Sequence, residues 1–105
     1  MYIRFKTKKF ATEFIDAVKK SAGKSFYFKE FGTWDFYYIN EKENGIVISY
    51  RNRKTDYIII INIFIDKYMK NQIIFNTYEG YDSIYTPLFY NEYKQLFYND
   101  YFIGE

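Results

Sequence analysis

The sequence contains no histidine, no cysteine and only one proline in 105 residues. Without histidine and cysteine the chain cannot build a Ser-His-Asp or Cys-His nucleophile system, and it cannot use imidazole as an acid or base. Zinc sites made of thiolate and imidazole ligands are excluded for the same reason. The side-chain chemistry that remains is that of carboxylates, lysine and tyrosine, which favours binding over catalysis as the function.

Glycines are also few, and they stand singly at positions 23, 32, 45, 80 and 104. None of them belongs to a glycine-rich loop that could cradle a phosphate. Paired carboxylates give no better signal, since Glu41 and Glu43 lie in a predicted turn and no pattern joins Asp66 to Asp82. We therefore expect no enzyme activity, no cofactor and no metal. A small nuclease that depends on a metal or on lysine and tyrosine is the third hypothesis.

Long hydrophobic runs are absent as well. The most apolar segment, residues 57–65, is interrupted by Asn62 and flanked by Asp56 and Asp66. A membrane-spanning helix needs about 20 apolar residues, so this segment is expected to be a buried strand. The basic residues near the start are not followed by an apolar stretch of signal-peptide length. We expect a cytoplasmic protein without membrane contact, and a single domain over residues 1–105.

Aromatic residues, by contrast, make up 26% of the chain. Phe, Tyr, Met, Ile, Asn and Lys, whose codons are rich in A and T, account for 63 of the 105 residues. This composition indicates an AT-rich genome, and it explains much of the aromatic excess without any function. The placement of the aromatics is still informative, because so many large rings cannot all be buried and tyrosine tolerates a wet surface.

The spacing of apolar residues predicts the fold. Residues 8–22 show a helical period, with Thr7 as the N-terminal cap and Gly23 as the stop. After them the period changes to two, and Asn44 with Gly45 is a hairpin signal. Thr86 and Pro87 begin a second helical pattern. The prediction is an α+β fold: a meandering antiparallel sheet of about five strands, with helices at about 8–22 and 87–102 packed on one face.

Charge is unevenly distributed, with a net charge of +6 over residues 1–29, −4 over residues 55–105 and +2 overall. Two of the three arginines, Arg51 and Arg53, stand beside Lys54 in a predicted turn. An AT-rich genome favours lysine over arginine, so two arginines in the same turn indicate a functional role for them. The planar guanidinium group suits phosphate or carboxylate pairing, and we assign this turn a binding role.

The middle strands also predict an aromatic and basic face on the side of the sheet away from the helices. Alternation places these residues on it: Tyr27, Lys29, Asp35, Tyr37, Ile39, Val47, Ser49 and Arg51. Such a face can serve as a protein interface, or it can stack single-stranded bases. The predicted partner-binding residues are Tyr27, Lys29, Tyr37, Arg51, Arg53 and Lys54.

Together these features predict a small non-catalytic protein that occupies the surface of a macromolecular partner. Analogy at the level of class points to an inhibitor of a nuclease or toxin in genetic conflict, either a phage or plasmid anti-defence protein of anti-CRISPR type or a toxin immunity protein. Mimicry of DNA is disfavoured, because the chain lacks a dense carboxylate surface. The alternative is a single-stranded nucleic-acid-binding domain. A homodimer is left open, since a symmetric partner can close an exposed strand edge.

Overall fold

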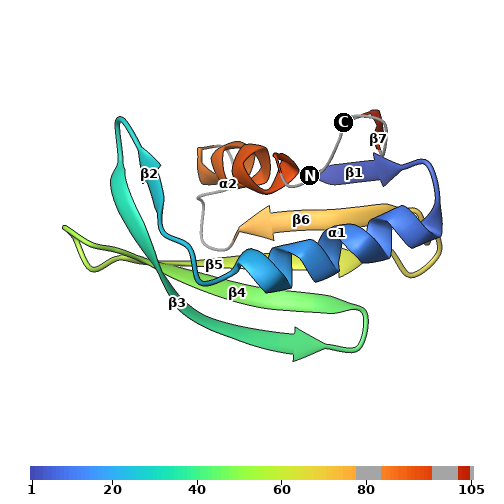
Figure 1. The fold of residues 1–105 in the computed structure, drawn as a ribbon, viewed down its shortest axis with the longest axis horizontal. Helices are drawn as coiled ribbons and strands as arrows, with labels where there is room; N and C mark the ends of the chain where they lie inside the picture. Colours follow the sequence, from blue (N-terminus) through green and yellow to red (C-terminus); the bar gives the residue numbers. More distant parts are fainter. Residues whose placement is uncertain (78–83, 96–101, 105) are drawn as a thin grey trace.

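The computed structural model describes residues 1–77, 84–95 and 102–104. Along the chain the elements are β1 (Tyr2–Phe5), α1 (Lys8–Ser21), β2 (Phe26–Phe28), β3 (Gly32–Lys42), β4 (Gly45–Asn52), β5 (Ile58–Ile65), β6 (Gln72–Thr77), α2 (Tyr85–Lys94) and β7 (Phe102–Gly104). The strands form one antiparallel sheet in the order β2-β3-β4-β5-β6-β1-β7 (Figure 1). The predicted α+β fold with a meander from β2 to β6 is confirmed.

Two details differ from the prediction. The sheet has six strands up to residue 77 and the short β7, where about five were expected. The second helix begins at Tyr85 and ends at Lys94, so its predicted extension to residue 102 is wrong at Phe102, which pairs with Phe5 in the sheet. Aromatic spacing alone could not reveal this pairing, because the partner strand lies at the other end of the chain. Residues 96–101 of the predicted second helix, and Asp82, lie outside the described residues.

The first helix follows its predicted signals. The Thr7 hydroxyl accepts a hydrogen bond from the Phe10 backbone N–H at 3.2 Å, which satisfies one of the free N–H groups of the first turn. The buried residues of α1 recur at helical spacing and form one stripe: Ala11, Phe14, Ile15 and Val18. This stripe holds α1 against β1, β5 and β6. No helix in the described parts of the chain is long and apolar enough to cross a membrane.

Both helices cover the same face of the sheet, which contains the hydrophobic core. Alternate residues of the two central strands are fully buried on this face: Ile46, Ile48 and Tyr50 of β4, opposite Ile63, Ile61 and Ile59 of β5. Figure 1 shows α1 lying across this side of the sheet, with α2 beside the end of β6. The opposite face carries no helix in the described part of the chain.

A hydrogen bond between two buried tyrosines joins α2 to the sheet. The Tyr93 hydroxyl donates to the Tyr50 hydroxyl at 2.8 Å, and the Phe89 ring stacks on Tyr50 with centroids 5.0 Å apart. Burial raises the pKa of Tyr50 and Tyr93, and it raises the pKa of Tyr90 to about 12. These three phenols therefore stay neutral in the folded protein at pH values where free tyrosine ionises.

The Tyr90→Phe variant tests this raised pKa. An unfolded tyrosine has a pKa near 10, so above about pH 10 the unfolded state alone loses this proton and the folded state is destabilised. The contribution of Tyr90 is complete below pH 10 and is lost as the pH rises toward 12. Urea unfolding of Tyr90→Phe should show about 1 kcal/mol less loss of stability between about pH 10 and 11 than the wild type.

The control for this experiment is Tyr68→Phe, because the Tyr68 side chain is 83% exposed. Its loss of stability with pH should equal that of the wild type. At neutral pH the Tyr90 substitution breaks no hydrogen bond to any described residue, because the buried Tyr90 hydroxyl has no hydrogen-bond partner among them. Equal alkaline losses in all three proteins would show that the pKa of Tyr90 is not raised.

Candidate binding surface

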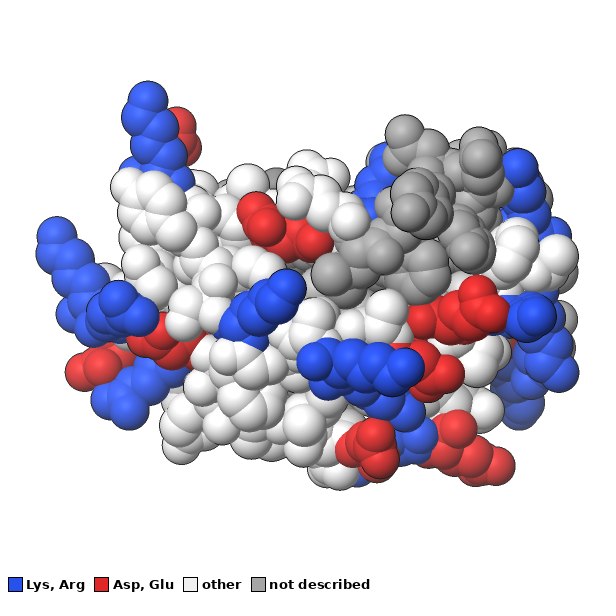
Figure 2. Space-filling view, in the orientation of Figure 1, with Lys and Arg blue, Asp and Glu red and all other residues white. Residues whose placement is uncertain are grey.

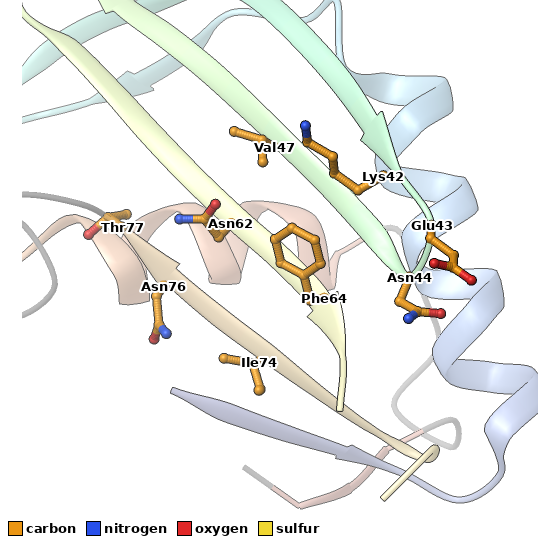
Figure 3. A pocket seen from close by; sticks show the side chains of 9 residues that line it. All are labelled: Lys42, Glu43, Asn44, Val47, Asn62, Phe64, Ile74, Asn76 and Thr77. Atoms are coloured by element: carbon orange, nitrogen blue, oxygen red, sulfur yellow. The ribbon is translucent and has the colours of Figure 1, made fainter. Parts of the chain in front are cut away.

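The face of the sheet opposite the helices carries a shallow hollow of about 790 Å³ (Figure 3). Strand pairing places Val47 beside Asn62 and Asn62 beside Asn76, with Phe64 beside Ile74 in the adjacent row. The residues that line the hollow are Lys42, Glu43, Asn44, Val47, Asn62, Phe64, Ile74, Asn76 and Thr77. We call this side of the sheet the open face.

The hollow combines an apolar floor with amide groups. Val47, Phe64 and Ile74 are half-buried there, and Figure 3 shows Asn62 and Phe64 side by side on β5 in its middle. The Asn62 side chain is 9% exposed, and its amide forms no hydrogen bond within the described residues. Asn76 differs, since its carbonyl accepts a hydrogen bond from the N-terminal amine at 2.7 Å. An amide without a partner beside apolar side chains suits contact with polypeptide backbone.

The composition of the open face matches the sequence prediction in most positions. Tyr27, Asp35, Val47, Ser49 and Arg51 lie on it, as the strand registers show. Among them Tyr27 is 68% exposed, whereas Ser49 is fully buried between its larger cross-strand neighbours. The face extends beyond the hollow to the exposed Ile58, which pairs with Arg51.

Ile39 was predicted on this face, and that prediction is wrong. A β-bulge at Tyr37 separates the pair Phe36–Tyr50 from the pair Tyr38–Ser49. One extra residue in β3 reverses the alternation, so Ile39 pairs with Ile48 and packs against the core. Tyr37 itself is exposed at the bulge with its ring 5.8 Å from that of Tyr38.

Arg51 and Arg53 are both paired with carboxylates of their own chain. Arg51 Nη2 lies 2.8 Å from Asp56 Oδ1. Arg53 binds Asp35 through two hydrogen bonds, with Nη2 at 2.7 Å from Oδ1 and Nε at 3.0 Å from Oδ2. The Ser25 hydroxyl donates to the same carboxylate at 2.6 Å. The two arginines therefore tie turns to strands rather than presenting unpaired guanidinium groups.

These contacts control the ionisation of Asp35. The hydrogen bonds from Arg53 and then from Ser25 lower the pKa of Asp35 to about 2. A carboxyl group whose pKa is lowered by folding stabilises the fold fully above its unfolded pKa, near 3.9 for aspartate. This stabilisation is lost as the pH falls toward 2, so the pairing with Arg53 is intact at neutral pH.

Asn52 organises the same end of the molecule and was missed by the sequence reasoning. It is 3% exposed, and its amide nitrogen donates to the Phe31 carbonyl at 2.9 Å. Its carbonyl accepts hydrogen bonds from the backbone N–H groups of Lys54 and Thr55, both at 3.0 Å. One side chain thus connects the β2–β3 turn to the β4–β5 turn. The available signal was the tendency of asparagine to bond the backbone two or three residues ahead.

The two connected turns enclose a second hollow of about 500 Å³. Lys29 and Lys54, from the predicted set, both line it, together with the rings of Trp34, Tyr57 and Tyr85. Tyr27 and Lys29 line a smaller neighbouring hollow. The structure therefore brings Tyr27, Lys29 and Lys54 to one end of the molecule and leaves Tyr37 apart from them, at the β3 bulge.

Charged side chains do not gather by sign on the helix side of the molecule. In Figure 2 the basic and acidic side chains are interspersed, with uncharged surface between them. Within the described residues, no three or more carboxylates lie where they could hold a metal ion together.

Comparison of the chain with protein-family models, curated proteins and solved structures finds no match to any of them. Two features of the structure bear on the function: the hollow on the open face, and the pair of turns connected by Asn52.

The Asn52→Ala variant tests the connection between the turns. Removing the amide leaves one carbonyl and two backbone N–H groups without their partners, which should lower the free energy of unfolding by about 3 kcal/mol. The matched control is Asn91→Ala, because Asn91 is exposed on α2 and should change stability by less than about 0.5 kcal/mol. Urea denaturation measures both. Similar losses in the two variants would contradict the role assigned to Asn52.

Proposed function

We propose that the protein is a non-catalytic binding protein that occupies a surface of a protein partner with the open face of its sheet. The observation that carries this proposal is the hollow of about 790 Å³ on a face that no described helix covers. Its apolar floor, amide groups and charged rim are the arrangement common at protein interfaces, where an apolar centre is surrounded by polar groups. Exposed Tyr27 and Ile58 extend the same face.

The charges around the hollow support a protein partner over single-stranded nucleic acid. Lys42 and Glu43 at its rim offset one another, and the nearby Arg51 is paired with Asp56. A nucleic-acid surface gains most of its affinity from cations that contact phosphates. The open face offers few such cations, whereas Val47, Phe64 and Ile74 offer apolar area.

The partner class that we propose is a nuclease or a toxin, which the protein would inhibit by covering a surface that its target needs. The support is analogy: a small chain without histidine or cysteine, and with an amino-acid composition typical of AT-rich genomes, suits the inhibitors of genetic conflict, such as anti-CRISPR and toxin immunity proteins. A cytoplasmic location belongs to the same proposal.

The experiment is capture of purified candidate nucleases and toxins on the immobilised protein, with inhibition of their activity as the readout. Val47→Lys and Ile74→Lys place a charge in the floor of the hollow. Each should weaken binding by at least about tenfold, because a charge at the centre of an interface is left without a partner. Thr12→Lys on the exposed side of α1 adds the same charge and should bind as the wild type does.

Two outcomes would contradict the proposal. One is a partner that binds Val47→Lys, Ile74→Lys and the wild type equally. The other is retardation of single-stranded RNA or DNA in a gel, with an affinity that falls steeply as salt is added. That second outcome would support the alternative function as a nucleic-acid-binding domain.

A further inference from the structure

Most of β3 forms an edge of the sheet, with no neighbouring strand on one side in the described part of the chain. β2 pairs only with Gly32, Thr33 and Trp34, and the rest of β3 pairs with β4 alone within the described residues. Figure 1 shows this part of β3 as the lower border of the molecule, with no element drawn beyond it. An edge strand presents a row of unpaired backbone N–H and C=O groups, which another extended chain can pair with.

The hairpin geometry identifies the residues that present these groups. A turn of two residues, Glu43 and Asn44, joins β3 to β4, and Lys42 and Gly45 close it as a pair that exchanges both backbone hydrogen bonds. Bonded and non-bonded pairs alternate along an antiparallel ladder. Lys42, Asn40 and Tyr38 therefore bond to β4. Ile39 and Glu41, which lie between them, direct their N–H and C=O groups to the free edge.

The regular part of this edge is short and has defined ends. The bulge at Tyr37 ends it on one side, and the turn that begins at Glu43 ends it on the other, which leaves residues 38–42 with Asn40 at their centre. We propose that two copies of the chain pair through this edge, β3 against β3, in antiparallel register about a two-fold axis at Asn40. Ile39 then bonds to Glu41 of the partner subunit, and the reverse pair forms by symmetry.

The side chains favour this register and a second copy as the occupant. With the axis at Asn40, Lys42 faces Tyr38 of the partner subunit, and Glu41 faces Ile39 of the partner subunit, so no like charges oppose one another. An axis at Glu41 would place two carboxylates opposite each other, and an axis at Ile39 would pair Glu41 with the bulge at Tyr37. The opposite charges of Lys42 and Glu41 offset one another within residues 38–42.

The pairing has a consequence for the open face. A two-fold axis perpendicular to the sheet keeps the open faces of both copies on the same side. Each hollow includes Lys42 at the end of β3 and Glu43 and Asn44 of the turn that follows it, so the two hollows lie on either side of the axis. The dimer is closed because each copy uses its β3 edge once. The dimer does not depend on the proposed function.

The first test is a disulfide across the axis. The natural chain has no cysteine, so Asn40→Cys introduces a single thiol. In this register the two positions form a non-bonded pair with Cα atoms about 4.5 Å apart, which a disulfide can span. In a glutathione redox buffer Asn40→Cys should form a covalent dimer at least about tenfold faster than Tyr27→Cys, whose site is 68% exposed and lies on β2. Equal rates would overturn the proposal.

The second test removes one backbone donor at the edge. Glu41→Pro deletes an outward N–H without breaking the ladder to β4, whereas Glu41→Ala keeps that N–H and removes the same ion pair with Lys19. In sedimentation equilibrium up to millimolar concentration, the wild type and Glu41→Ala should rise from 13.0 kDa toward twice that mass, and Glu41→Pro should not. Circular dichroism and urea unfolding verify that Glu41→Pro is folded. A monomeric wild type, or a folded Glu41→Pro that dimerises like the wild type, would overturn the proposal.

Discussion

The placement of both helices on one face of the sheet is the constraint on which the rest of the structure depends. It makes alternate residues of β4 and β5, such as Ile48 and Ile61, part of a dry core. The residues between them, such as Val47 and Asn62, are left on a face that no described helix covers. The Tyr93–Tyr50 hydrogen bond maintains this arrangement because it joins α2 to the middle of the sheet. Because successive side chains of a strand point to opposite faces of the sheet, the same strands supply both the core and the open face.

Those parts of the fold that depend on local sequence could be predicted. The Thr7 cap, the helical spacing after it and the hairpin signal at Asn44 and Gly45 each act within a few residues, and the structure has α1 and the β3–β4 hairpin there. The turn itself lies one residue earlier than the signal, at Glu43 and Asn44, because Gly45 already pairs with Lys42. Features that depend on residues far apart in the sequence could not be predicted. The bulge at Tyr37 lies between Phe36 and Tyr38, where nothing in the local sequence indicates it, and it moves Ile39 from the open face to the core side of the sheet. β7 is defined by pairing with β1, from the other end of the chain.

The arginines show why residue type alone did not define the site. Arg51 and Arg53 stand out in a chain with twelve lysines, and the guanidinium group suits pairing with an anion. The anions are Asp56 and Asp35 of the same chain, and Asp35 lies 18 residues from Arg53 in sequence. A sequence shows that a cation is suited to an anion, but only the fold shows whether that anion is internal. Asn52 was missed for the related reason that its amide bonds Phe31, 21 residues away.

The shortness of β2 explains why the free edge of β3 and the hollow on the open face lie next to each other. The chain turns at Gly32, where the backbone adopts a positive φ of 85° that glycine tolerates, and β2 covers only the first three residues of β3. Had β2 continued along β3, it would have paired with Ile39 and Glu41 and closed the edge. Because it does not, the backbone groups of those two residues and the hollow beside Lys42 are left at the same corner of the sheet. A partner strand on β3 would therefore also border the open face, so that pairing at the edge and binding on the face would act at adjoining surfaces.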